Sequence, residues 1–285
     1  MQRFRIGAIT DEFSPDIQAA SASMASLGMQ ASELRMVFGK NIIDLSDEEI
    51  DRAVAIVGAL SLPVVSIASP LLKCTLPNAP ATDSRFQQDA FAAKHNFEDQ
   101  PRLTRRAFEI AHRTGAKIIR VFTYWRTIDP PAVFDRVVEA LGNLAELAAK
   151  EDLIIGLENE HACNVATAAE TRKVLDVLDH PALQVVWDPA NAYVSGENPF
   201  PGGYSMLPAK RIAHVHAKDC KLDGHKPLWG PLGECDIDWK GQIDALVRDG
   251  YTGYINLETH WQGPGGDKHE ASMICGRNLK ALVEA

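Results

Sequence analysis

Short apolar segments recur along the whole chain and alternate with amphipathic segments of helical period. Eight of them are rich in Val, Ile and Leu, and near-continuous apolarity is typical of strands that are covered on both faces. They are residues 5–10, 31–35, 64–69, 118–123, 153–158, 183–188, 212–217 and 254–258. Strands that alternate with helices predict a parallel sheet.

The segments between these strands carry the capping signals of helices. Ser14 followed by a proline predicts a helix N-terminus, and the runs that begin at Ser46 and Thr167 have the capping-box pattern. Gly115 and Gly250 each follow a helical pattern and precede a strand, where a left-handed C-cap residue is expected. The helices are therefore bounded between successive strands.

Eight strand and helix units in a chain of 285 residues predict an α/β fold, the (β/α)8 TIM barrel, with residues 1–285 forming a single domain. A doubly wound open sheet is the main alternative. It is disfavoured because no glycine-rich phosphate loop follows the first strand and the eight units leave no residues for a second domain.

Two connections are longer than barrel loops usually are. Residues 70–100 are too polar for the core and are expected to form an excursion over one end of the barrel, either as a substrate lid or as a contact in a homo-oligomer. Residues 189–211 are rich in proline and glycine and are expected to overhang the C-terminal mouth.

Composition and charge restrict the classes of partner. The chain has no apolar run long enough to span a bilayer and no charged-then-apolar leader, so a soluble, cytoplasmic protein without membrane contact is expected. Lys and Arg total 29 against 38 Asp and Glu, and the net charge of -9 disfavours nucleic acid as a partner. The five cysteines form no CxxC pair and are expected to be reduced thiols.

Four consecutive predicted strands end in a residue that can bind a metal: Glu158, Asp188, His216 and Glu258. Barrel enzymes carry their active sites at these strand ends. A single acidic residue there is usually a helix cap or a solvated loop residue, but four on successive strands favour one shared site. Three oxygen donors and one imidazole suit Mn, Mg, Co or Zn as the divalent metal ion.

The alternation of side chains along a strand separates the two histidines of the seventh strand. Side chains two apart share a face, so His214 and His216 point the same way. If that face is the barrel interior, His216 lies at the mouth, and His214 lies one layer deeper in a supporting role.

The sequence around these residues resembles the xylose-isomerase-like barrels, which include sugar phosphate isomerases and epimerases, inosose dehydratases and ketose 3-epimerases. The resemblance covers nearly the whole chain and depends on the motifs GLEN at 156–159, WDPAN at 187–191, HVHAKD at 214–219, GPLGECDIDW at 230–239 and GYTGYINLET at 250–259. It implies that Glu158, Asp188, His216 and Glu258 bind the metal, and that Glu158 and Glu258 also act as catalytic acid and base groups.

One position departs from the relatives. Ketose epimerases and AP endonucleases of this superfamily have a histidine three residues after the aspartate of the sixth strand, where this chain has Asn191. The difference argues against a multi-zinc endonuclease site and against a close match to the ketose epimerases.

The activity that these features imply is that of a metal-dependent sugar isomerase or epimerase with a small carbohydrate substrate. A divalent ion would acidify the hydrogen next to a carbonyl, and a glutamate would remove it to give an enediolate. A metal-dependent dehydratase or lyase on a keto-sugar or inosose would use the same groups. An AP-endonuclease-like phosphodiesterase would need more histidine ligands and a basic rim, and this sequence lacks both. A noncatalytic metal- or sugar-binding barrel would not need two glutamates that point inward opposite each other.

Other polar residues near the strand ends are candidates for substrate binding: Arg120, Glu160, His161, Asn191, His214 and Lys218. For Arg120 and Lys218 a structural ion pair is an equally good interpretation. Glu33, Arg35 and Lys73 are weaker candidates, and Glu33 is expected to pair with Arg35.

Four tryptophans lie near predicted strand ends or loops, where an aromatic ring could stack on a sugar: Trp125, Trp187, Trp229 and Trp261. Trp187 is out of phase with Asp188 and is expected to pack beneath a helix instead.

Overall fold

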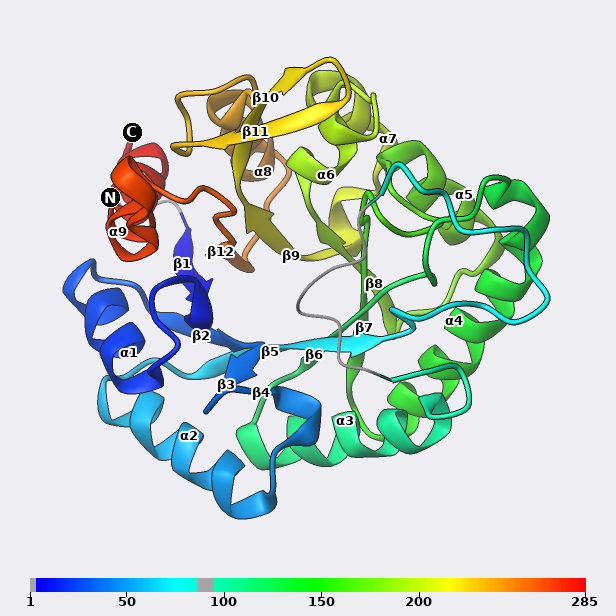
Figure 1. The fold of residues 1–285 in the computed structure, drawn as a ribbon, viewed down its shortest axis with the longest axis horizontal. Helices are drawn as coiled ribbons and strands as arrows, with labels where there is room; N and C mark the ends of the chain where they lie inside the picture. Colours follow the sequence, from blue (N-terminus) through cyan, green and yellow to red (C-terminus); the bar gives the residue numbers. More distant parts are fainter. Residues whose placement is uncertain (1–3, 87–94) are drawn as a thin grey trace.

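The computed structural model describes residues 4–86 and 95–285. Eight parallel strands close into a barrel in the order β1-β12-β9-β8-β7-β6-β5-β2, and helices surround it (Figure 1). The strands are β1 (Arg5–Ile9), β2 (Ala31–Leu34), β5 (Val64–Leu71), β6 (Ile118–Val121), β7 (Ile154–Glu158), β8 (Leu183–Trp187), β9 (Ile212–Ala217) and β12 (Tyr254–Leu257). Each predicted strand is present, and the predicted (β/α)8 fold is confirmed.

The helices form the outer layer in Figure 1. They are α1 (Ile17–Ser26), α2 (Asp47–Ala59), α3 (Gln100–Thr114), α4 (Phe134–Lys150), α5 (Ala168–Val177), α6 (Pro189–Val194), α7 (Tyr204–Met206), α8 (Trp239–Arg248) and α9 (Lys268–Glu284). Two small antiparallel hairpins extend from the barrel: β3 (Met36–Val37) with β4 (Lys40–Asn41), and β10 (Asp219–Asp223) with β11 (Lys226–Gly230).

The predicted helix ends agree with the structure in most cases. Ser46 forms a complete capping box at α2, and Gly115 takes the left-handed conformation after α3. Thr167 caps α5, but Glu170 bonds the amide of Ala166 instead of completing the box. The prediction for α1 is wrong, because Asp16 is the N-cap and Ser14 instead accepts a hydrogen bond from the Asp16 amide.

The barrel interior is filled with side chains below its C-terminal end. Gly156 of β7 shows how closely they pack, because a Cβ at this position would lie 2.7 Å from Val186 Cγ2 and 2.9 Å from Ile118 Cγ2. Real Cβ atoms do not approach other atoms so closely. The absence of a side chain at Gly156 therefore lets branched residues of both neighbouring strands fill the space beneath Glu158.

The excursion expected at residues 70–100 begins after Leu71, the last residue of β5, and ends where α3 begins. Residues 87–94 lie outside the described residues. The part before them runs beside the loop that follows β6, with Thr82 bridging Thr127 and the Trp125 amide bonding Cys74 O at 3.0 Å. This part therefore lies at the C-terminal end of the barrel, and its role as a lid or an oligomer contact stays a prediction.

The second long connection lies mostly elsewhere than expected. Only α6 stays beside the mouth, whereas the segment Pro199–Gly203 and α7 contact α5 and α8 in the outer layer (Figure 1). Gln242 of α8 donates a hydrogen bond to Pro199 O at 3.1 Å. The expectation that residues 189–211 overhang the mouth is wrong for these segments, because their apolar residues complete the helical layer.

No helix in residues 4–86 and 95–285 is long and apolar enough to cross a membrane.

Candidate metal centre

The four predicted ligands meet at the C-terminal end of the barrel. Glu158 ends β7, Asp188 follows β8, His216 lies in β9 and Glu258 follows β12. Each offers a ligand atom, and these atoms all lie within 4.8 Å of one another. All four residues are buried. They meet because adjacent parallel strands bring their carboxyl ends to the same edge.

A buried carboxylate beneath this cluster orients the histidines. Glu33 Oε2 lies 3.1 Å from His216 Nε2 and 3.0 Å from His214 Nε2. A proton on His216 Nε2 that is donated to Glu33 leaves Nδ1 free to bind a metal. That nitrogen faces the centre, 3.0 Å from Glu158 Oε1. His214 is fully buried, which fits the predicted supporting role rather than contact with a substrate.

The predicted pairing of Glu33 with Arg35 is wrong. Besides the two histidines, Glu33 accepts hydrogen bonds from Ser66 and Asn256, each at 3.0 Å. Arg35 instead pairs with Asp11, Glu12 and Glu258, and its Nη1 donates to Glu258 Oε1 at 3.0 Å. Residues far apart in the sequence supply these partners, so the closeness of Glu33 and Arg35 in the sequence does not predict their pairing.

Arg120 and Lys218 form ion pairs with the carboxylates of the centre. Lys218 Nζ lies 2.8 Å from Asp188 Oδ2 and 2.9 Å from Glu258 Oε2. Arg120 Nη1 lies 3.3 Å from Glu158 Oε2. Both residues are thus in buried ion pairs, and their contact with a substrate stays a prediction.

The carboxylates of the centre differ in acidity. Burial raises the pKa of Asp188, and the negative charges of Glu158 and Glu258 raise it further against the effect of Lys218. Burial alone would also raise the pKa of Glu258, but Lys218, His260 and His216 lower it well below its usual value. Glu258 is therefore ionised at neutral pH, as a general base must be.

The residues present suit a divalent cation. Three carboxylates and one imidazole form a donor set typical of Mg, Mn, Co or Zn sites. Two buried oxygens, Glu158 Oε2 and Asp188 Oδ2, accept no hydrogen bond from the described residues, although Arg120 and Lys218 lie nearby as ion-pair partners. A cation between the carboxylates would satisfy these oxygens and reduce their mutual repulsion.

The remaining candidates for substrate binding, Glu160, His161 and Asn191, contact one another. His161 Nδ1 lies 2.9 Å from Asn191 Oδ1 and 3.0 Å from Glu160 Oε1. Burial alone would raise the pKa of Glu160, but Lys73, His161 and Lys218 lower it far below its usual value. Lys73 Nζ lies 3.8 Å from Glu160 Oε2. Lys73, a weaker candidate from the sequence, therefore lies beside Glu160.

The tryptophans fall into different environments. Trp187 is fully buried and its Nε1 donates to Gln242 of α8 at 3.1 Å, so the prediction that it packs beneath a helix is confirmed. Trp229 lies near the centre, with its ring centroid 4.7 Å from that of His260. Trp125 packs with Phe122 in a small buried cluster, and Trp261 packs against the main core.

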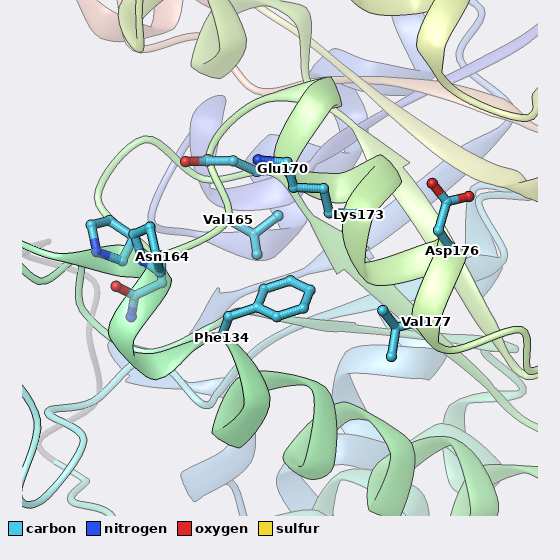
Figure 2. A pocket seen from close by; sticks show the side chains of 9 residues that line it. Phe134, Asn164, Val165, Glu170, Lys173, Asp176 and Val177 are labelled. Atoms are coloured by element: carbon cyan, nitrogen blue, oxygen red, sulfur yellow. The ribbon is translucent and has the colours of Figure 1, made fainter.

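A separate cleft of about 490 Å³ lies on the side of the barrel between α4 and α5. Figure 2 shows Phe134, Val165 and Val177 around this cleft, with charged side chains at its margin. None of the predicted site residues lines it. The chemistry expected from the sequence is therefore located at the strand ends and not in this cleft.

Comparison with protein families matches residues 22–279 to the model described as "Xylose isomerase-like TIM barrel". The chain belongs to this family. The match covers seven of the eight barrel strands, all but β1, together with the four residues of the candidate metal centre.

The curated relatives include inosose dehydratases. That of Bacillus licheniformis is 26% identical over 164 residues, which cover 51% of this chain and 53% of the relative. That of Lacticaseibacillus casei is 22% identical over 225 residues, which cover 68% and 74%. The match spans only about half the length of the first of these relatives.

Solved structures share the fold over nearly the whole chain. A probable 3-DHS dehydratase from Bacillus anthracis has a TM-score of 0.71 at 19% identity, covering 99% of this chain and 98% of that one. A D-allulose 3-epimerase from Methylomonas sp., in complex with D-allulose, has a TM-score of 0.70 at 18% identity, covering 100% and 98%.

Proposed function

We propose that the chain is a divalent-metal-dependent isomerase or epimerase that removes a proton next to the carbonyl of a keto-sugar or inosose. The observation that carries this proposal is the convergence of Glu158, Asp188, His216 and Glu258 within 4.8 Å. Two of these four are glutamates, so the same cluster offers both metal ligands and bases. Relatives and structural neighbours that are named for action on hydroxyketones support the proposal.

The metal would be held by the four residues and would polarise the carbonyl of the substrate. Glu258 would be the base that removes the proton, and Arg35 and Lys218 hold its carboxylate in place. Glu158 would return a proton in an epimerisation. Arg120 and Lys218 would stabilise the negative charge that develops when the proton leaves.

His216 and Glu33 contribute by position. The contact of Glu33 with His216 Nε2 fixes the tautomer that presents Nδ1 to the centre. His214 holds the same carboxylate from below, so the ring of His216 has little freedom to turn. The donor set is thus oriented before a ligand arrives.

A dehydratase acting on an inosose or similar keto-sugar is the second candidate. The curated relatives at 22% to 28% identity are inosose dehydratases, and Asn191 replaces the histidine expected of ketose epimerases. The first step would be the same proton abstraction. A hydroxyl group β to the carbonyl would then leave as water instead of a proton returning.

One experiment tests both candidates. Protein purified without chelators is analysed for bound metal and incubated in D₂O with a panel of ketoses, inososes and 3-keto sugars. Deuterium incorporation next to the carbonyl supports the proposed proton route, and loss of water identifies the dehydratase. Full retention of the substrate hydrogen, with undiminished activity in Glu258→Gln and Glu158→Gln, would contradict the mechanism.

A further inference from the structure

His161 is held in place by residues that adjoin two of the four predicted metal ligands. Its Nδ1 lies 2.9 Å from Asn191 Oδ1 and 3.0 Å from Glu160 Oε1. The backbone amide of Asn191 bonds Asp188 Oδ1 at 2.9 Å, and Glu160 follows Glu158 by two residues. The segments that carry two of the ligands therefore also fix the position of this histidine.

These contacts determine which nitrogen of the His161 ring can transfer a proton. The carboxylate of Glu160, ionised at neutral pH, can only accept a hydrogen bond, so Nδ1 carries a proton. Any proton that the imidazole gives or takes must then pass through Nε2. Within residues 4–86 and 95–285, Nε2 makes no hydrogen bond, and 21% of the side chain is exposed. The ring also lies beside that of Phe86, with 6.1 Å between centroids.

The Asn191 side chain carries a buried donor that also has no partner among the described residues. Asn191 is fully buried, and its Nδ2 donates no hydrogen bond there. An unpaired buried donor is costly, so a polar atom of a bound molecule would stabilise it. Glu160, by contrast, is well held, since it also accepts from the Ala162 amide at 3.2 Å and lies 3.8 Å from Lys73. The cluster thus combines fixed acceptors with two polar atoms that suit a substrate oxygen.

The two candidate reactions differ in their need for such an acid. Removal and return of a proton at carbon can be carried out by the glutamates of the centre. Loss of a hydroxyl group is more demanding, because hydroxide is a poor leaving group and a positioned acid that protonates it lowers the barrier.

We propose, on the basis of the proposed function, that His161 is the acid that protonates the leaving hydroxyl group in a dehydration. Glu258 takes the proton next to the carbonyl, and the electron pair of that C–H bond forms a C=C bond. The C–O bond at the β-carbon breaks, and the proton on His161 Nε2 goes to its oxygen, which gives water and an unsaturated ketone. Exchange with solvent then returns both residues to their starting states. Asn191 and Glu160 are positioning residues for the ring.

Two rates in D₂O test this role, with 2-keto-myo-inositol and 3-keto-glucose as probes and Mn²⁺ supplied. NMR follows deuterium incorporation next to the carbonyl of recovered substrate, and it follows loss of water. In His161→Gln, loss of water should fall about 10²- to 10⁴-fold, the usual contribution of a positioned acid. Deuterium incorporation should continue, because Glu258 and the metal ligands are unchanged. The ratio of the two rates does not depend on the amount of folded protein, so a folding defect cannot imitate the result.

Two further variants isolate the cause. Asn191→Leu removes the hydrogen bond to His161 Nδ1 and should lower the ratio of water loss to exchange about 2- to 12-fold, the net value of one hydrogen bond expressed as a rate. His112→Gln breaks an exposed histidine–carboxylate pair, His112 with Glu151 at 3.1 Å, and should leave both rates unchanged. A fall in His112→Gln equal to that in His161→Gln would overturn the proposal.

The outcomes separate the role of His161 from the proposed function. A wild type that incorporates deuterium without losing water keeps the proposed proton abstraction and overturns the role of His161. Undiminished loss of water in His161→Gln overturns it as well, and so does an equal fall of both rates, because the residue would then act through substrate binding or the fold. A wild type that shows neither reaction with either probe contradicts the proposed function and the role together.

Discussion

Lys218 and Asp219 are successive residues, and their side chains serve two different regions of the molecule. Lys218 reaches Asp188 and Glu258 in the candidate metal centre. Asp219 instead accepts hydrogen bonds from four backbone amides, those of Cys220, Gly233, Cys235 and Ile237, at 2.8 to 3.3 Å. Both regions therefore contain buried carboxylates, but one is neutralised by cations and the other by the backbone.

The difference shows which carboxylates are suited to chemistry. Asp219 anchors the segment 231–237 to the end of β9, and burial raises its pKa to about 6 against the effect of the four amides. Its oxygens are fully engaged and none remains for a ligand. In the candidate metal centre, by contrast, Glu158 and Asp188 each keep an oxygen without a hydrogen bond. These two oxygens lie within 3.3 Å of their ion-pair partners Arg120 and Lys218, and a bound cation would give them a further partner.

The largest expected effect is on turnover. Glu258→Gln keeps an oxygen donor but loses the base, so the turnover number should fall about 10²- to 10⁴-fold while metal stays bound. Steady-state kinetics with a ketone substrate and elemental analysis measure the two quantities. If a folded Asp219→Asn variant lost as much activity, the contrast between Glu258 and Asp219 would be contradicted.

The next effect is on metal binding. Asp188→Ala removes a donor atom and leaves Lys218 without one of its partners, so affinity for Mn²⁺ should fall more than the 10- to 100-fold typical of losing a partner outside the ligand set. Calorimetric titration measures it. Asp219→Ala is the matched control and should bind Mn²⁺ as the wild type does. Equal metal content in Asp188→Ala and wild type would contradict the site.

Asp219→Ala should act on stability instead. Four amides would lose their acceptor, and the free energy of unfolding should fall by roughly 3 kcal/mol, since water can satisfy part of this loss. Chemical denaturation of metal-free protein measures it. The exposed control Asp244→Asn should change stability by no more than about 0.5 kcal/mol. If Asp219→Ala were as stable as the wild type, the segment 231–237 would not depend on the hydrogen bonds to Asp219.

The smallest expected effect is on the pH dependence of metal binding, and it tests the role of Glu33. Burial alone would lower the pKa of His216, but Glu33 and Glu158 raise it well above 6.5. A metal must displace this proton, so affinity for Mn²⁺ should rise with pH, by up to about tenfold per unit between about pH 6 and pH 8. Glu33→Gln should lower the pKa of His216 and flatten this dependence. If the pH dependence of Mn²⁺ affinity were the same in Glu33→Gln as in the wild type, Glu33 would not control the protonation of His216.

Much of the fold could be predicted from the sequence because parallel strands covered on both faces are continuously apolar. The donor residues of the centre could also be predicted, since each stands at or near the end of such a strand. Glu33 was misassigned because its partner His214 is 181 residues away in the sequence. The buried position of Lys73 could not be predicted, because nothing in the pattern of a polar loop shows which of its residues turns inward.

The sequence by itself determined the order of the strands and the kinds of donor atom at their ends, because both follow from local pattern and from the shared direction of parallel strands. The tertiary structure alone decided which cation faces which carboxylate. Arg35 reaches Glu258, and Lys73 reaches Glu160, only across the closed barrel or its loops. Charge interactions depend on distance in space, and no local pattern encodes the distance between residues brought together by closure of the barrel.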